Sequence, residues 1–493
     1  MTNTTHWRLE QSYATLPGFL YSRVRPEIPP SPRLLLFNHT LAAELGLTGY
    51  DKPIDRVQWS AWLSGKQLPP GAVPIAQAYA GHQFGYFTML GDGRAILLGE
   101  QVCGNKHSFD IQLKGAGRTP YSRRADGRAT LYSMLREYLI SEAVFGLGIP
   151  GSRSLAVCAT GEQVQRESPQ PGAVLTRVMQ SHLRVGTFEY VRQFGSPDDP
   201  GILIRYALNK LYPDVDAGER PGLTLLKATS QRQARLMAQW MGAGFVHGVM
   251  NTDNMSLSGE TFDYGPCAFI NDYDPDKVYS SIDHYGRYAF GRQPQIAQWN
   301  LSVLAGALLS GIDPDEEKAA GMAREVLHEF AGDYETAWLQ HMGQKIGLKN
   351  AGPADKPLIK GLLDLMQQHK ADYTNSFLFL MNLPVPQAEM YNDAEFRQWL
   401  AKRSQRLNLE GSHPADALKR MKAVNPVYIP RNHLVEEALM AASEGPDHEK
   451  WDFSAFNSLL QRLQKPYEWQ EESEKYISGP PGGEAHYQTF CGT

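Results

Sequence analysis

The chain has 493 residues, of which 42% are hydrophobic and 20% are charged, and its 48 basic and 53 acidic residues give a net charge of -5. This length predicts two lobes or domains, because a single hydrophobic core stops growing at smaller sizes. The acidic balance gives no electrostatic reason to expect a nucleic-acid partner, and no apolar run reaches the ~18 residues of a membrane span.

The start of the chain, MTNTTHWRLE, has neither the pattern of a signal peptide nor that of a transit peptide, so we expect a cytoplasmic protein without a membrane partner. The four cysteines, at positions 103, 158, 267 and 491, are far apart and form no C-x-x-C motif. This spacing indicates neither a zinc site nor a disulfide framework.

Short apolar runs between residues 75 and 99 surround two glycine-rich stretches, GHQFG at 81–85 and LGDGR at 90–94. Such turns let backbone N-H groups approach phosphate oxygens, although an ordinary hairpin has the same signature. Strands are expected at 95–98 and at 109–114, where apolar and polar residues alternate and Lys114 comes last.

An apolar stripe at helical spacing follows, from Leu131 to Leu139, and glycines and a proline end it by residue 150. Glu137 lies beside this stripe, where it could turn inward and pair with Lys114, as the strand lysine and helix glutamate of protein kinases do. An exposed glutamate is the alternative interpretation. The loop 115–128 carries four arginines, which suit anionic oxygens or, alternatively, solvent.

Residues 247–265 contain the motif that decides the interpretation. HGVMNTDN followed by FDYG has the register of the kinase pattern H-x-D-x-x-x-x-N and D-F-G, in which the first Asp is the base and the Asn and second Asp hold metal. Asn254 and Asp263 occupy the two metal positions, but Val249 occupies the position of the base. Asp253 is the carboxylate placed to accept a proton instead.

Strands are predicted before this motif, at 155–158 and 173–178, and helices after it, including 358–366, 396–407 and 434–440. We therefore predict an α+β, protein-kinase-like two-lobed fold with a mainly helical C-terminal extension. The predicted units are a strand-rich nucleotide-binding part at 1–190, a helical part with the catalytic and metal motifs at 191–477, and a flexible tail at 478–493 that carries Cys491.

The chain resembles the selenoprotein O (YdiU-like) family of protein nucleotidyltransferases. The resemblance covers about residues 75–300 and the tail, and its most specific pieces are GHQFGYF, LGDGRA, FDIQLKGAGRTPYSRRADGRA, LREYL, HGVMNTDNMS, FDYGP and GRYAFGRQP with QWNL. The resemblance implies a pseudokinase fold that binds ATP in reversed orientation. It also implies transfer of AMP to Ser, Thr or Tyr hydroxyls of proteins, the chain itself included, with release of pyrophosphate.

The resemblance also implies roles for individual residues. Asp253 matches the family's proton acceptor, while Asn254 and Asp263 match its magnesium or manganese ligands, Asp263 also touching the nucleotide. Glu137 matches the ion-pair partner of the lysine. The nucleotide-binding positions are matched by Gly91, Gly93, Arg94, Lys114, Asp126, Gly127, Arg177 and Arg184.

The tail places Cys491 third from the end, where some family members carry selenocysteine that pairs with a cysteine in the loop after the metal Asp. Here residues 271–294 contain no cysteine, so a simple thiol is the alternative. Two other functions remain open. One is a small-molecule or protein kinase with a relocated base; Val249 argues against a small-molecule kinase, because such kinases use the Asp that it replaces. The other is a catalytically inactive ATP-binding pseudokinase, which would tolerate the loss of Asn254 and Asp263, yet both are present.

Overall fold

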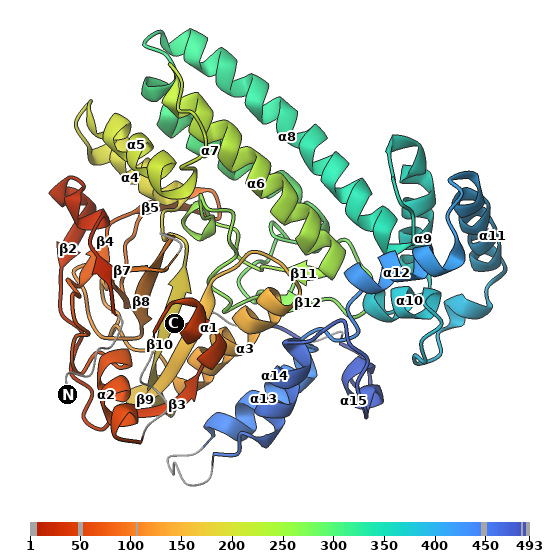
Figure 1. The fold of residues 1–493 in the computed structure, drawn as a ribbon, viewed down its shortest axis with the longest axis horizontal. Coiled ribbons are helices and arrows are strands. Elements are labelled where there is room, and N and C mark those ends of the chain that lie inside the picture. The colour runs from red at the N-terminus through yellow and green to blue at the C-terminus, as the bar shows by residue number, and fades with distance from the viewer. Residues whose placement is uncertain (1–6, 48–52, 105–106, 445–450, 485–486, 490–493) are drawn as a thin grey trace.

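The computed structural model describes residues 7–47, 53–104, 107–444, 451–484 and 487–489. An antiparallel sheet is built from the N-terminal part of the chain, and helices make up most of the remainder (Figure 1). The chain therefore has an α+β fold, as the order of strand and helix patterns predicts. Within the described residues, no helix is both long enough and apolar enough to cross a bilayer.

The main sheet has eight strands in the order β2-β4-β7-β8-β10-β9-β3, with β1 paired to β7. All of its pairings are antiparallel. Its strands are β1 (Leu9–Glu10), β2 (Tyr21–Arg23), β3 (Arg33–Phe37), β4 (Ile75–Gln77), β7 (Ala95–Val102), β8 (Ser108–Lys114), β9 (Arg153–Gln165) and β10 (Pro169–Met179). Two small hairpin-like pairs, β5 (Ala80–Gln83) with β6 (Tyr86–Met89) and β11 (Phe245–Val246) with β12 (Ala268–Phe269), lie outside it.

Each face of the sheet is covered by helices. On one face, α1 (His39–Glu44) and α2 (Pro53–Leu63) enclose an aromatic cluster that includes Trp7, Trp59 and Trp62. On the other face, α3 (Leu131–Gly146) packs on β9 and β10. Thr130 caps α3 by accepting a hydrogen bond from the Ser133 N-H, and twelve residues of the helix are buried because sheet and helices enclose it.

The long helices lie side by side above the sheet (Figure 1). They are α4 (Val185–Phe194), α5 (Asp199–Leu211), α6 (Pro221–Ala243), α7 (Gln293–Leu308) and α8 (Glu316–Lys345). Helix α6 begins with a proline, and Gly244 ends it with a φ of 74°, a backbone conformation that suits glycine. The segment after α6 therefore turns sharply into β11 and the HGVMNTDN motif.

The remaining helices form the C-terminal part of the chain. They are α9 (Lys356–Gln368), α10 (Tyr373–Leu380), α11 (Ala394–Leu409), α12 (Pro414–Val424), α13 (Asn432–Ser443), α14 (Ser454–Leu463) and α15 (Ser473–Ile477). Helices α13 and α14 return to the sheet and pack against α3. Arg136 on α3 forms an ion pair with Glu436 on α13 at 3.2 Å.

The described part of the tail is anchored to the segment that follows Asp263. Thr489 donates a hydrogen bond from its hydroxyl to the Pro266 carbonyl at 2.5 Å, and its N-H donates to the Tyr279 carbonyl at 2.8 Å. The hydroxyl of Tyr487 donates to Glu436 at 2.8 Å. Cys491 lies outside the described residues, whereas Cys267 is buried two positions beyond Gly265.

Candidate functional site

We call residues 247–266, which contain the HGVMNTDN and FDYG motifs, the catalytic segment. A cleft of about 1060 Å³ lies between the sheet and this segment, and we call it the central cleft. Strands β7, β8 and β10, helix α3 and the arginine-rich loop 115–130 supply its walls, and the segments 249–254 and 263–266 close it. Every predicted site residue lines this cleft: Gly91, Gly93, Arg94, Lys114, Asp126, Gly127, Glu137, Arg177, Arg184, Asp253, Asn254 and Asp263. The structure thus brings together residues from four separate stretches of sequence.

Two cations and two carboxylates form one buried network at the base of the central cleft. Lys114 Nζ donates to Glu137 and, at 2.5 Å, to Oδ1 of Asp263. Arg177 donates to Glu137 at 2.9 Å and to the same Asp263 oxygen at 2.5 Å. Burial alone would raise the pKa of Glu137, but Lys114 and Arg177 outweigh it and hold that pKa below its usual value.

Asp263 is held in an uncommon backbone conformation. Its φ of 62° lies in the left-handed region, which non-glycine residues rarely adopt and which is concentrated at functional sites. Burial favours the neutral carboxyl, but Arg177, Lys114 and Arg184 hold the pKa of Asp263 well below its usual range. Asp263 is therefore a carboxylate at any physiological pH.

The oxygen donors of Asn254 and Asp263 fit a divalent cation. The Asn254 amide nitrogen donates to the Val249 carbonyl at 3.0 Å, and the amide oxygen of Asn254 takes no part in this contact. Both contacts of Asp263 use Oδ1, and no described residue donates to Oδ2. No group of three or more His, Cys, Asp or Glu side chains suited to a metal ion occurs among the described residues.

Asp253 carries a buried carboxylate oxygen for which the described residues supply no hydrogen-bond donor. Its Oδ1 is buried and accepts no hydrogen bond from any residue that the structure describes. Burial raises the pKa of Asp253 from 3.8 to about 6, against the opposing effect of Arg184. A buried acceptor without a donor is costly, and a substrate hydroxyl would satisfy it.

Gly81 on β5 lies directly against this carboxylate. A Cβ at position 81 would be 2.6 Å from Oδ1 of Asp253, closer than van der Waals contact allows. We expect Gly81→Ala to displace the Asp253 side chain and lower the rate of transfer by at least about tenfold, with a cost in stability of about 1–3 kcal/mol. Gly18→Ala, where a Cβ meets nothing within 4 Å, is the control for both measurements. An equal rate in the two variants would contradict this prediction.

Asp92 is a buried carboxylate of the central cleft that the motif analysis did not single out. It accepts from the Gln77 N-H at 3.1 Å and the Gln112 amide at 3.3 Å, and it lies 3.8 Å from the Arg184 guanidinium. Burial raises the pKa of Asp92 to about 6, while Arg184 opposes this change. The sequence feature that could have identified Asp92 is its position between Gly91 and Gly93.

A second unpredicted group supports the catalytic segment from behind. The His82 ring on β5 is hydrogen-bonded to Glu189 on α4, and the His82 backbone N-H donates to the Thr252 hydroxyl at 2.7 Å. These contacts fix the residue that precedes Asp253. The sequence offers no local signal for this pair, because the two partners are 107 positions apart.

Two glycines of the central cleft have no room for a side chain, because neighbouring atoms approach their backbone closely. A Cβ at Gly91, where φ is 136°, would lie 2.4 Å from the Tyr121 ring, and one at Gly127 would lie 2.3 Å from the Gly117 carbonyl. The glycine turn is therefore packed tightly under the arginine-rich loop. Asp126 accepts from Arg166 at 2.8 Å, which holds this loop to β9 and β10.

We predict that Lys114 and Glu137 act as one unit. Because each loses the same contact when the other is removed, the double substitution to alanine should cost about 0.5–3 kcal/mol less than the sum of the two single losses. The measurement is a double-mutant cycle on kcat/KM. The pair Lys318 and Asp313, 2.9 Å apart and outside the central cleft, is the control, for which no change in rate is expected. Additive losses at 114 and 137 would contradict the coupling.

Comparison with known proteins assigns the family. The family model for protein adenylyltransferase SelO matches residues 4–464. The chain belongs to the SelO family. Proteins named protein nucleotidyltransferase YdiU are 49% identical to it in Shouchella clausii, over the full length of both chains, and 50% identical in Brevibacillus brevis, over 99% of this chain and 98% of the relative. The protein of the same name from Geobacillus kaustophilus is 49% identical over 99% of both chains.

The match to the SelO family runs through the sheet, the central cleft and most of the C-terminal helices, because it extends to residue 464. This agrees with the resemblance drawn from the motifs between residues 75 and 300. The family is one of nucleotidyltransferases, so the central cleft belongs to an enzyme whose relatives are named for nucleotidyl transfer to protein.

Proposed function

We propose that this chain is a protein adenylyltransferase with a kinase-like two-lobed arrangement, in which the central cleft binds ATP with magnesium or manganese. The reaction joins AMP to a Ser, Thr or Tyr hydroxyl of a protein, other chains or itself, and releases pyrophosphate. The observation that carries the proposal is the pairing of Val249, which cannot accept a proton, with the buried and unsatisfied Oδ1 of Asp253.

The positive charges in the central cleft favour a triphosphate whose γ-phosphate lies at the base of the cleft. Lys114 and Arg177 are both nearly inaccessible to solvent there, and Arg184 lies on the path toward Asp253. Burial and the Arg177 charge lower the pKa of Lys114. These cations can hold the β- and γ-phosphates, so that the α-phosphate faces the catalytic segment.

The proposed step is an in-line displacement at the α-phosphorus. The substrate hydroxyl oxygen forms a bond to that phosphorus, the bond to the oxygen bridging to the β-phosphate breaks, and the hydroxyl proton passes to Oδ1 of Asp253. The Arg184 guanidinium donates to the Asp253 carbonyl at 3.0 Å and so holds this residue in place. A divalent ion held by Asn254 and Asp263 would neutralise phosphate charge during transfer.

The position of a radioactive label tests which phosphate moves. With ATP labelled on the α-phosphate, divalent metal and either the chain alone or added proteins, we expect label on protein hydroxyls and an added mass of one AMP. With ATP labelled on the γ-phosphate, we expect labelled pyrophosphate and unlabelled protein. Protein labelled from the γ position would indicate a kinase, and bound ATP without labelled protein would indicate an inactive binding module.

A further inference from the structure

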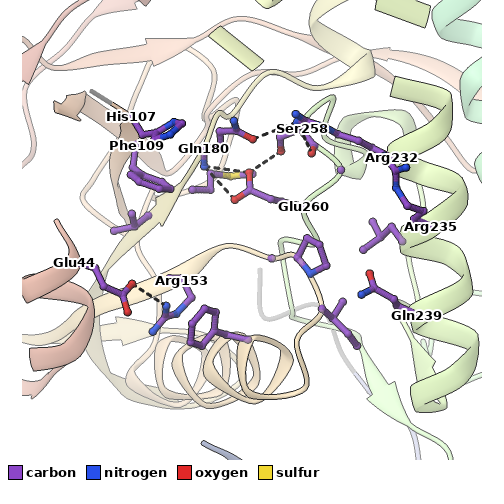
Figure 2. A pocket seen from close by; sticks show the side chains of 18 of the residues that line it. Glu44, His107, Phe109, Arg153, Gln180, Arg232, Arg235, Gln239, Ser258 and Glu260 are labelled. Atoms are coloured by element: carbon purple, nitrogen blue, oxygen red, sulfur yellow. Dashed lines mark hydrogen bonds and ion pairs between the residues drawn. The ribbon is translucent and has the colours of Figure 1, made fainter. Parts of the chain in front are cut away.

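A second cavity, of about 1000 Å³, lies where β8 begins and β10 ends, away from the central cleft, and we call it the rear cavity (Figure 2). It shares no lining residue with the central cleft. Its walls come from α1, β8, α3, β9 and β10 on the sheet side and from α5, α6 and α8 on the helical side. The SelO activity proposed above makes no use of it.

The rear cavity and the central cleft are lined by different parts of the same elements. On β8, Ser108 and Phe109 line the rear cavity and Lys114 lines the central cleft, and α3 contributes Phe145 to the rear cavity and Glu137 to the central cleft. Likewise Glu260 lines the rear cavity, and Asp263, three positions later, lines the central cleft. A molecule bound in the rear cavity would touch both the sheet and the helical part.

The walls of the rear cavity are largely apolar. Phe109, Phe145, Ile149, Met179 and Leu236 contribute to them. Phe145 leaves 47% of its surface exposed and lines the cavity. A concave cavity of this size that combines apolar walls with polar groups is typical of a site for a small molecule.

Most charges in the rear cavity are already compensated. Arg153 pairs with both Glu142 oxygens at 2.8 Å, and it lies 3.5 Å from Glu44. Lys210 pairs with Asp110 at 2.8 Å. These groups have little capacity left for a ligand of either sign.

The exception lies on α6, where two arginines face the cavity one turn apart (Figure 2). Arg232 is engaged, since it donates to the carbonyls of Leu211 at 2.7 Å and Ser258 at 3.0 Å. Arg235 makes no hydrogen bond or ion pair with any residue that the structure describes. It is exposed, so its guanidinium is accessible to a ligand.

Glu260, on the opposite wall, does not cancel this positive charge. Its two oxygens accept from the Gln180 N-H at 3.1 Å each, and one also accepts from the Ser258 hydroxyl at 2.6 Å. Burial raises the pKa of Glu260 to about 7, although the Ser258 hydroxyl opposes this change. The carboxyl is therefore turned toward the backbone and is partly neutral near pH 7.

We propose that the rear cavity binds an amphipathic anion, a small molecule with an apolar body and one acidic group. Arg235 holds the acidic group, and the apolar body lies against the phenylalanine-lined walls. The acidic group can belong to an aliphatic or to an aromatic acid, because both present the same chemistry to the guanidinium.

Fluorescence of 8-anilinonaphthalene-1-sulfonate, an aromatic dye with one acidic group, tests the site on the folded full-length chain. We expect saturable binding at about one dye per chain, and saturating ATP with magnesium should not displace it. Arg235→Glu should weaken binding by at least about tenfold, since it replaces attraction by repulsion. Arg205→Glu, at an exposed arginine of α5 outside the cavity, is the matched control and should leave the affinity unchanged.

Two further measurements separate the charge from the shape of the site. Ser108→Trp, on a half-buried lining residue of β8, should block the dye by filling the cavity without changing its charge. Decanoate or 1-naphthoate should displace the dye, and the one that does so shows whether the site prefers an aliphatic or an aromatic acid. Decanol, which lacks the acidic group, should compete at least about tenfold more weakly. Dye binding that survives both Arg235→Glu and Ser108→Trp, displacement by ATP, or equal competition by decanol would overturn the proposal.

Discussion

Replacing Asp263 with asparagine is expected to lower the rate of AMP transfer by about 10³-fold or more. The amide keeps the volume of the carboxyl but removes the negative charge that pairs with Lys114 and Arg177. The same charge would hold the divalent ion, and stabilisation of the transition state by that ion is worth several kcal/mol. The shift in melting temperature that ATP with magnesium gives the wild type should also be lost, because metal-dependent binding stabilises only the folded state.

Some loss of stability will accompany this change, since breaking one partner of a buried ion pair costs about 3–5 kcal/mol. Asp355→Asn is a suitable control, because Asp355 is buried, pairs with Arg406 at 2.5 Å and lies outside the central cleft. The control should lower stability and leave transfer unchanged. An Asp263→Asn variant with wild-type turnover would eliminate this residue as a metal ligand.

Asp253→Asn is expected to slow transfer by ~10²- to 10⁴-fold while raising the stability of the fold. The rate falls because the amide cannot accept the hydroxyl proton. Stability rises because the folded-state pKa of Asp253, about 6, exceeds its ordinary value of 3.8, so this carboxyl increasingly opposes folding as pH rises from 3.8 to 6 and does so fully above pH 6. At about 1.4 kcal/mol per pKa unit, this penalty is at most about 3 kcal/mol at neutral pH.

The pH dependence of the wild type follows from the same pKa. The reaction needs the Asp253 carboxylate, so the rate of transfer should fall about tenfold per pH unit below pH 6. The stability of the fold should change in the opposite direction, because the stability contributed by protonated Asp253 is present at low pH and is lost as pH rises through 6. Rate profiles and thermal melts between pH 5 and 8 measure both trends. If Asp253→Asn weakened ATP binding alone and left turnover intact, the role in proton transfer would be wrong.

The parts of the site that the sequence predicted are those with a local signal. Lys114 ends an alternating strand, and Glu137 lies beside a helical stripe, so their elements could be assigned and their contact inferred. Asn254 and Asp263 were placed by the spacing of a motif. The α+β class followed from the order of strand and helix patterns, whereas the kinase-like arrangement remains a proposal.

The parts that could not be predicted depend on contacts between distant stretches. His82 and Glu189 meet only because the hairpin of β5 and β6 lies against α4 and the catalytic segment. The raised pKa of Asp253 depends on burial, which no spacing of residues reveals. The rear cavity likewise arises from α1, α6 and α8 meeting around the sheet, and none of these helices carries a motif.

The return of the C-terminal helices to α3 has a consequence for synthesis of the protein. Glu137 belongs to a helix whose outer side is covered by α13 and α14, and Tyr487 contacts Glu436, the partner of Arg136. As the chain leaves the ribosome from its N-terminus, the elements that line the central cleft emerge well before this cover. The central cleft therefore gains its complete support only when almost the whole polypeptide has been released, so a truncated translation product lacks the helices that cover α3.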